Sequence, residues 1–119
     1  MARDFRKIIA WRHAYDLALS IYRATAEFPS SERYGITAQV RRAATSVAAN
    51  IAEGSSRSSR TDYLRFLEIA LGSLRECECF LMLSRDLQYL ESAQFDELNG
   101  HADEAARTLT GLMSSVRDA

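Results

Sequence analysis

Apolar residues recur at spacings of three and four along most of the chain, which is the period of one face of an α-helix. The first such segment predicts a helix over residues 6–27. Its apolar positions are Trp11, Ala14, Tyr15, Ala18, Ile21, Tyr22, Thr25 and Phe28. Pro29 disfavours helical geometry at the residue before it, and Ser30 or Ser31 can cap the segment that follows, so the first helix is expected to end here.

A second helix is predicted to begin near Ile36 and to end at Gly54, because glycine is the common residue in the left-handed cap of a helix. One face of this helix is apolar. It carries Ile36, Val40, Ala43, Ala44, Val47 and Ile51. The serine-rich residues 55–59 are predicted to form a short polar loop.

Two longer helices complete the chain. Ser59 and Asp62 have the spacing of a capping box, which predicts that the third helix begins there and runs to about Leu90. Its core positions are Tyr63, Phe66, Leu67, Ala70, Leu74, Cys77 and Leu81. Ser92 is predicted to cap the fourth helix. The apolar positions of that helix are Phe95, Leu98, Ala102, Ala105, Leu109, Leu112 and Val116.

Length and composition agree with a helical fold. The 119 residues are enough for one domain with a core, and five glycines and one proline are fewer than strands and tight turns require. Four amphipathic helices with short connections favour an up-down-up-down arrangement. We therefore predict an all-α, left-handed four-helix bundle formed by a single domain over residues 1–119.

The second helix also has a polar stripe beside its apolar face. The stripe consists of Gln39, Arg42, Ser46, Asn50 and Glu53. The remaining face carries mainly small residues, namely Ala38, Thr45, Ala48, Ala49 and Ala52. Small residues let another backbone approach closely, which predicts an interface between subunits. The alternative is that alanine is simply the best helix former and is tolerated in water.

The third helix has more apolar surface than one bundle can bury. Beside its core positions it carries a second apolar row of Ile69, Phe80, Leu83 and Leu87, with Gly72 and Ser73 next to it. A glycine inside a helix costs about 1 kcal/mol relative to alanine, which is explained if a partner approaches there. We therefore predict a homo-oligomer in which the second and third helices supply much of the interface.

A polar cluster on these two helices is predicted to fix the register of the interface. The cluster consists of Gln39, Arg42, Ser46, Asn50, Glu53, Gly72, Ser73 and Glu76. Two members have a simpler interpretation within one subunit. Arg42 would pair with Glu53 or Glu76, and Ser46 would bond back to the Arg42 carbonyl of its own helix.

Charge is unevenly distributed, although the net charge is only −1. Residues 1–60 hold ten Arg or Lys and five Asp or Glu, whereas residues 61–119 hold five and eleven. This distribution predicts one basic and one acidic surface region. The candidates for contact with nucleic-acid phosphates are Arg41, Arg57 and Arg60, extended by Arg3, Arg6, Lys7 and Arg12 if the helix ends coincide.

No residue pattern indicates catalysis or a cofactor. His13 and His101 lack a carboxylate three residues before them, so the Glu-x-x-His pairs of metal-binding bundles are missing. Cys77 and Cys79 do not have zinc-finger spacing and are expected to stay reduced. Phosphate-binding glycine loops, Gly-x-Ser-x-Gly and dinucleotide fingerprints are also missing. We expect no enzymatic activity, no metal and no cofactor.

The chain has no sequence signal for a membrane. No apolar run approaches the roughly 20 residues that a membrane span needs. The N-terminus has charges but no uninterrupted apolar stretch and no small-residue cleavage site. We therefore expect a cytoplasmic protein.

Several motifs distributed along nearly the whole chain are shared with one protein family. They are Trp11-x-x-Ala14, Phe28-Pro29-x-x-Glu32-x-Tyr34-Gly35-Ile36-Thr37-x-Gln39-x-Arg41-Arg42-Ala43, Ser46-Val47, Asn50-Ile51-Ala52-Glu53-Gly54, Arg57 and Ala70-x-Gly72-Ser73-x-x-Glu76. In these motifs the chain resembles the bacterial four-helix bundle proteins encoded within intervening sequences of large-subunit ribosomal RNA genes. It departs from their common pattern at Ala48, where proline is frequent, and at Ile36, where leucine is usual.

The resemblance implies a ring-like homopentamer with no established enzymatic activity and a role in binding RNA or nucleoprotein. A related branch, the accessory proteins of diversity-generating retroelements, is a basic pentamer that binds a reverse transcriptase and nucleic acid. The net charge of −1 makes this chain a weaker nucleic-acid candidate than that branch. A second hypothesis is a protein-interaction scaffold that presents its acidic face or its ring opening to a basic partner such as a polymerase or reverse transcriptase.

Overall fold

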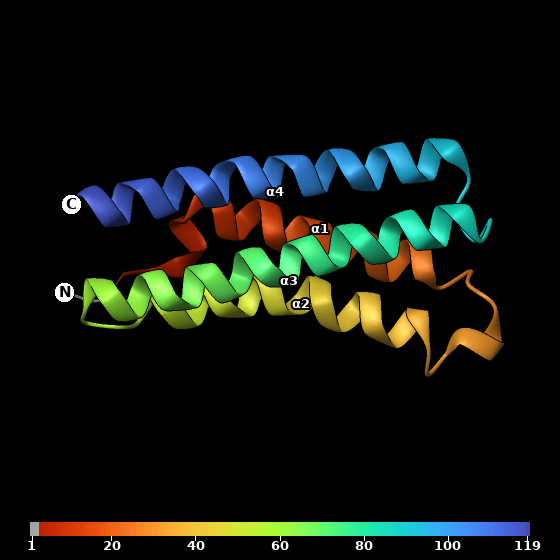
Figure 1. Cartoon of the computed structure of the whole chain (residues 1–119), viewed down its shortest axis with the longest axis horizontal. Helices are drawn as coiled ribbons and strands as arrows, with labels where there is room; N and C mark the ends of the chain where they lie inside the picture. Colours follow the sequence, from red (N-terminus) through yellow and green to blue (C-terminus); the bar gives the residue numbers. More distant parts are fainter. Residues whose placement is uncertain (1–2) are drawn as a thin grey trace.

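The computed structural model describes residues 3–119, which form four α-helices and two short 3-10 helices. The α-helices are α1 (Ile9–Thr25), α2 (Ile36–Ser55), α3 (Arg60–Asp86) and α4 (Ser92–Asp118). The 3-10 helices are η1 (Phe5–Lys7) and η2 (Ser30–Glu32). The α-helices run alternately up and down the long axis of a molecule that measures 45 × 24 × 19 Å (Figure 1). The predicted all-α, up-down four-helix bundle is confirmed.

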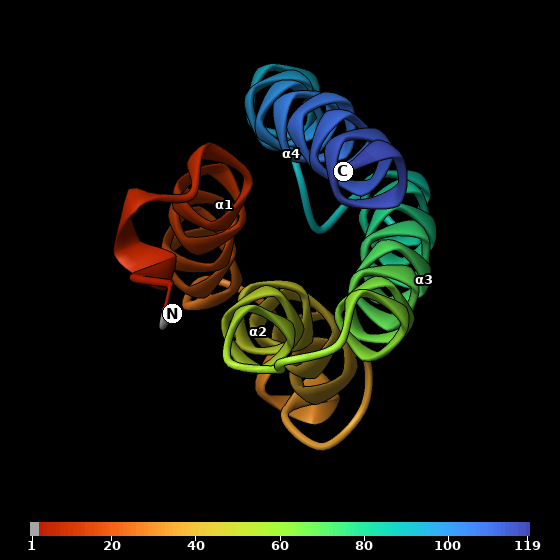
Figure 2. The ribbon, with the colours of Figure 1, turned by 90° about the vertical axis from the view of Figure 1, so that its left-hand side faces the viewer.

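Each α-helix packs against its two neighbours around the bundle (Figure 2). Contacts join α1 to α2, α2 to α3, α3 to α4 and α4 back to α1. The N-terminal segment, the α2–α3 connection and the end of α4 therefore lie together at one end of the bundle (Figure 1). The two other connections lie at the opposite end.

The core consists of one cluster of apolar side chains contributed by all four helices. Its fully buried members include Ile21, Val40, Val47, Ile51, Leu67, Leu74, Leu81 and Leu109, as predicted. The prediction was wrong for Tyr15 and Tyr22, which are 41% and 44% exposed, and it missed Leu17, which is fully buried. Because α1 has apolar residues on more than half of its circumference, its spacing pattern did not identify the inward face.

The first helix begins later than predicted. Asp4 accepts a hydrogen bond from the backbone of Arg6 and caps η1, and Ile8 is extended, so the α-helix starts at Ile9 instead of residue 6. At its other end α1 stops at Thr25, two residues before the predicted limit. The basic N-terminal residues thus belong to a separate turn and not to α1.

Gly54 does not cap α2 as predicted. It lies inside the helix, and no glycine in residues 3–119 has a positive φ. A Cβ atom at this position would be 2.7 Å from the Cβ of Phe66 and 3.2 Å from Cδ1 of Tyr63. Glycine is therefore required here because α3 approaches the backbone of α2 closely.

The connections around α3 differ in part from the predictions. Ser59 caps α3 as expected, since its hydroxyl accepts from the Asp62 backbone at 3.0 Å. The helix ends at Asp86 and not at Leu90. The backbone N–H groups of Gln88 and Tyr89 donate to the carbonyls of Arg85 and Ser84, with Gln88 in the left-handed region at φ 65°. This is a Schellman ending with glutamine at the usual glycine position.

The start of α4 is also shifted by one residue from the prediction. Glu91, and not Ser92, is the N-cap residue, and its backbone N–H donates to Oε1 of Gln94 at 2.9 Å. The side chain three residues into the helix therefore satisfies the cap backbone, as in a capping box. Within residues 3–119, none of the helices is both apolar enough and long enough to cross a membrane.

Candidate nucleic-acid interface

Arg3 ties the N-terminal segment to the end of α2. Its Nη1 donates to the carbonyl oxygens of Ser55 and Arg57, both at 3.0 Å. Its guanidinium also lies 4.5 Å from the centre of the Tyr63 ring on α3. The N-terminal segment therefore lies at the same end of the bundle as the α2–α3 connection. This meets the condition under which the N-terminal basic residues extend the basic residues of that connection.

We call the resulting surface the basic end of the bundle, formed by Arg3, Arg6, Lys7, Arg57 and Arg60. Two of its members have carboxylate partners. Arg6 pairs with Asp4 at 2.9 Å, and Arg57 pairs with Glu53 at 2.8 Å while lying over the ring of Phe66. Lys7 and Arg60 are exposed, and no ion pair involves either of them in the part of the chain that the structure describes.

Arg41 does not belong to the basic end, contrary to the prediction. Its Nε donates to Oγ1 of Thr25 at 2.8 Å and its Nη2 to the carbonyl of Tyr22 at 3.2 Å. Its guanidinium also lies 4.5 Å from the centre of the Tyr22 ring. Arg41 thus joins the end of α1 to the start of α2, at the opposite end of the bundle. Arg12 lies on the first turn of α1 and pairs with Asp16 at 3.4 Å.

Three members of the predicted polar cluster are brought together inside one protomer. The hydroxyls of Ser46 on α2 and Ser73 on α3 hydrogen-bond at 2.8 Å. Nδ2 of Asn50 donates to the Ser46 carbonyl and hydroxyl at 2.8 and 3.0 Å. The alternative for Ser46 is wrong, because it is Thr45 whose hydroxyl bonds back to the Arg42 carbonyl, at 3.1 Å.

The remaining members of the polar cluster lie at the surface of the protomer. They are Gln39, Arg42, Glu53, Gly72 and Glu76. The expected pairing of Arg42 with Glu53 or Glu76 is wrong, since Glu53 pairs with Arg57 and no ion pair of Arg42 is found in residues 3–119. A Cβ atom added at Gly72 would have no atom within 4 Å. The position at which a partner was predicted to approach is therefore open in the protomer.

An apolar groove runs between α1 and α2 and has a volume of about 340 Å³. Its walls are Trp11, Tyr15, Ala18, Leu19 and Tyr22 on α1, and Thr45, Ala48, Ala49 and Ala52 on α2. The small residues of α2 thus do not lie on a plain solvated face but form one wall of this groove. The wall on α1 was not predicted, because Tyr15 and Tyr22 were expected to lie in the core.

A second apolar surface follows α3. The exposed apolar side chains of α3 are Ile69, Met82, Leu83 and Leu87. The prediction of an unburied row on α3 is confirmed for three of these residues, whereas Phe80 is half-buried against the core and Met82 was not predicted. Ile69, Leu83 and Leu87 share one side of the helix, and we call them the α3 row. Met82 lies on a different side of α3.

The thiol of Cys77 is buried in the bundle interior. Burial, together with the nearby Glu78 and Glu76 carboxylates, raises the pKa of Cys77 to about 12, so its thiol stays protonated at neutral pH. Cys79 is exposed. No group of three or more His, Cys, Asp or Glu side chains in residues 3–119 is arranged to hold a metal ion.

Comparisons with known proteins agree with the fold and with the shared motifs. The family model of the 23S rRNA-intervening sequence protein matches residues 6–111. A crystal structure at 1.70 Å of a protein of unknown function from the S23 ribosomal protein family of Bacteroides thetaiotaomicron is similar, with 25% identity and a TM-score of 0.79. The match covers 88% of this chain and 98% of that one. No curated protein matches. The chain therefore belongs to the 23S rRNA-intervening sequence protein family.

Proposed function

We propose that this protein binds RNA or a ribonucleoprotein through the basic end of the bundle, as part of a homo-oligomer. The observation that carries the proposal is the convergence of Arg3, Arg6, Lys7, Arg57 and Arg60 from segments far apart in the sequence. Arginine and lysine side chains bind phosphate oxygens without reading the sequence, so such a surface suits a nucleic-acid backbone. Family membership points in the same direction through the ribosomal RNA genes that the family name refers to.

The charges of the basic end are available to different degrees. Lys7 and Arg60 can bind a phosphate directly. Arg6 and Arg57 must first exchange their exposed carboxylate partners, an exchange that is easy because exposed ion pairs contribute little stability. Arg3 is held by two carbonyls and contributes mainly its charge. We therefore expect moderate affinity with a steep dependence on salt.

The oligomer is supported by the groove and the α3 row. They lie on different sides of the bundle, since one is between α1 and α2 and the other is on α3. A contact that places the α3 row of one copy in the groove of the next is therefore a head-to-tail contact, which closes into a ring when the rotation permits. We propose such a ring, with the homopentamer that the resemblance implies as the expected assembly.

Retention of RNA by the purified protein tests the proposed activity. A Lys7→Gln, Arg57→Gln, Arg60→Gln variant should lose most of the retained RNA, and the wild-type affinity should fall steeply as salt rises. The control is Arg23→Gln, Arg33→Gln, which removes two exposed arginines at the opposite end of the bundle. Equal RNA retention by both variants, or retention that is insensitive to salt, would reject the basic end as the binding surface.

A protein scaffold is the second candidate, and the acidic C-terminal half favours it. Exposed carboxylates follow the outer side of α4, namely Asp96, Glu97, Asp103 and Glu104. Such a surface suits a basic partner, for example a polymerase or reverse transcriptase. Capture of a basic protein from nuclease-treated lysate, lost on charge reversal of these carboxylates, would support the scaffold over direct RNA binding.

A further inference from the structure

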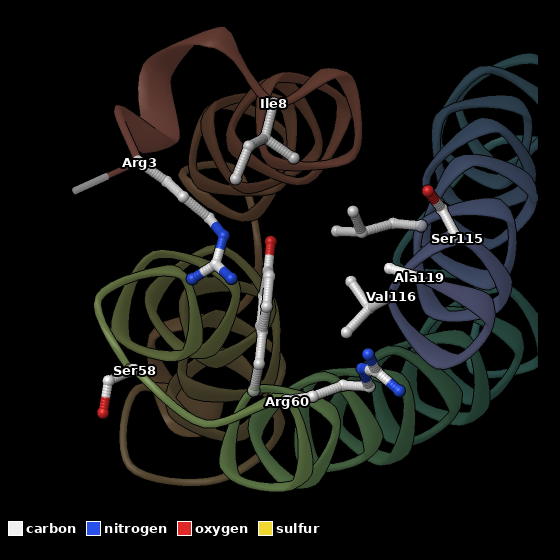
Figure 3. Close-up of a pocket in the computed structure, with 9 residues that line it drawn as sticks. Arg3, Ile8, Ser58, Arg60, Ser115, Val116 and Ala119 are labelled. Atoms are coloured by element: carbon white, nitrogen blue, oxygen red, sulfur yellow. The ribbon is translucent and has the colours of Figure 1, made fainter. Parts of the chain in front are cut away.

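An open cavity of about 660 Å³ lies at the basic end, between the N-terminal segment, the start of α3 and the end of α4 (Figure 3). Its size falls within the range of roughly 300 to 1,000 Å³ that is typical of small-molecule sites. Ile8, Leu112 and Val116 supply apolar lining, and Arg3, Arg60 and Tyr63 supply polar groups. No side chain of Asp or Glu is part of this lining. The side chains of the lining therefore combine an apolar wall with two positive charges.

Tyr63 is the most informative residue of the cavity. It is only 2% exposed, yet it lines the cavity, and no described residue hydrogen-bonds its hydroxyl. Burial raises the pKa of this hydroxyl, and the nearby Arg3 opposes the rise. Because Tyr63 lines the cavity, its hydroxyl can donate to a molecule bound there.

Two arginines indicate that a molecule bound in the cavity would be an anion. Arg60, the first residue of α3, extends into the cavity (Figure 3), and no carboxylate lies within 4.0 Å of its guanidinium in residues 3–119. Arg3 is fixed by the carbonyls of Ser55 and Arg57 and stacks on the Tyr63 ring. Arg3 therefore holds Tyr63 in place and adds a second positive charge, while Arg60 is free to bind an anion.

We propose that this cavity binds a phosphate monoester with a flat apolar body, of the size of a mononucleotide. Arg60 and Tyr63 would donate to terminal phosphate oxygens, and the base would pack against Leu112 and Val116. A phosphate suits the site better than a carboxylate, because its oxygens point in several directions and can accept from donors on different elements. The ligand is either a free mononucleotide or the 5′-terminal nucleotide of an RNA. The second form rests on the proposed function.

Methyl NMR spectra and calorimetry with adenosine monophosphate test the site. The nucleotide should shift the methyl signals of Ile8, Leu112 and Val116, whereas adenosine and inorganic phosphate should each bind more weakly by about tenfold or more. Tyr63→Phe keeps the ring and should weaken binding about tenfold, with a larger loss for Arg60→Gln. Arg23→Gln, at the far end of α1, is the matched control and should bind like the wild type.

Unshifted methyl signals at millimolar nucleotide, or unchanged binding by both cavity variants, would overturn the proposal. A short RNA with either a 5′-phosphate or a 5′-hydroxyl separates the two sources. If the RNA with a 5′-phosphate binds more tightly, the ligand of the cavity is the end of an RNA. If the two RNAs bind equally and adenosine monophosphate also binds, the ligand is a free nucleotide. If the protein retains RNA but does not bind the nucleotide, the cavity site is rejected and the proposed function is not. Nucleotide bound without RNA retention rejects only the proposed function.

Discussion

The hydroxyl groups of Ser46 on α2 and Ser73 on α3 lie 2.8 Å apart and hydrogen-bond the two helices within one protomer. Asn50 completes the group by donating to the carbonyl and the hydroxyl of Ser46. All three side chains are half-buried. Apolar packing alone tolerates sliding of one helix along another, whereas a hydrogen bond between fixed positions does not. These residues therefore set the register of α2 against α3, before any second subunit is involved.

Removal of this hydrogen bond should destabilise the fold. We expect Ser73→Ala to lower the free energy of unfolding by about 1 kcal/mol, and Ser46→Ala to lower it at least as much because Asn50 also loses an acceptor. The double variant should lose less than the sum, by about 0.5 to 1 kcal/mol. Urea unfolding measures all three. Ser114→Ala, an exposed serine on α4, is the control. Strictly additive losses would show that the two hydroxyls do not interact.

Gly54 should be the glycine least tolerant of substitution. We expect Gly54→Ala to lower the free energy of unfolding by about 1 to 3 kcal/mol, because the new methyl group would overlap Phe66 and push α2 from α3. Gly111→Ala is the matched control, since nothing lies within 4 Å of a Cβ atom there. That control should gain up to about 1 kcal/mol. Thermal unfolding with equal shifts for both variants would contradict the close approach.

The number of helices and most of the core were predictable from the sequence, because burial in a bundle follows the helical period directly. Val47, Leu74 and Leu109 illustrate this, since each is fully buried as its spacing indicated. The period fails on α1, where Tyr15 and Leu17 are both apolar and only packing against neighbouring helices decides which one turns inward. Helix ends are less predictable still, because they depend on single hydrogen bonds such as that of Asp4 with Arg6.

The candidate site was predictable only in part. The motif residues Ser46, Asn50 and Ser73 do form one cluster, but the sequence does not distinguish a contact within a subunit from one between subunits. Arg41 was placed with the wrong partners because its contacts come from α1, sixteen and nineteen residues earlier in the chain. Tyr63 was assigned to the core correctly, but its place in the lining of a cavity depends on the arrangement of three chain segments that no local pattern records.

The buried thiol predicts a specific dependence of stability on pH. The pKa of Cys77 in the folded protein is raised to about 12 from the ordinary value of 9.0. A raised pKa means that the stabilisation is complete below about pH 9 and is lost as the pH rises towards 12. Above pH 9, the free energy of unfolding should therefore fall with a slope of up to about 1.36 kcal/mol per pH unit from this group.

Urea unfolding at a series of pH values can isolate this contribution. The Cys77→Ala variant should lose less stability than Cys79→Ser between about pH 9 and 11, because only the latter retains the buried thiol. The two variants also differ in labelling. At neutral pH the Cys77 thiol, which is the single thiol of the Cys79→Ser variant, should react slowly with a thiol reagent. The rate of this labelling should follow the rate of unfolding. Rapid labelling of the native protein at that thiol would contradict its burial.

Gly72 should affect assembly and folding in opposite directions. The position is exposed on α3 and has open space around it, so Gly72→Ala should stabilise the isolated protomer by up to about 1 kcal/mol through helix propensity. If a second subunit approaches there, the same methyl group should raise the dissociation constant of the oligomer. Sedimentation equilibrium measures the latter, with Gly111→Ala as control. An unchanged dissociation constant for Gly72→Ala would place the interface elsewhere.

The groove between α1 and α2 should be the surface most sensitive to a new charge. Ala49 lines it and is exposed in the protomer, so Ala49→Glu should leave the helical circular dichroism signal unchanged. In the assembled ring the carboxylate would be buried without a partner, which costs several kcal/mol, and the oligomer should dissociate. Ala93→Glu, at an exposed alanine on the first turn of α4, should remain assembled. Because the two substitutions add the same charge, a protomeric Ala49→Glu beside an assembled Ala93→Glu would locate the interface in the groove, and two intact oligomers would exclude the groove from it.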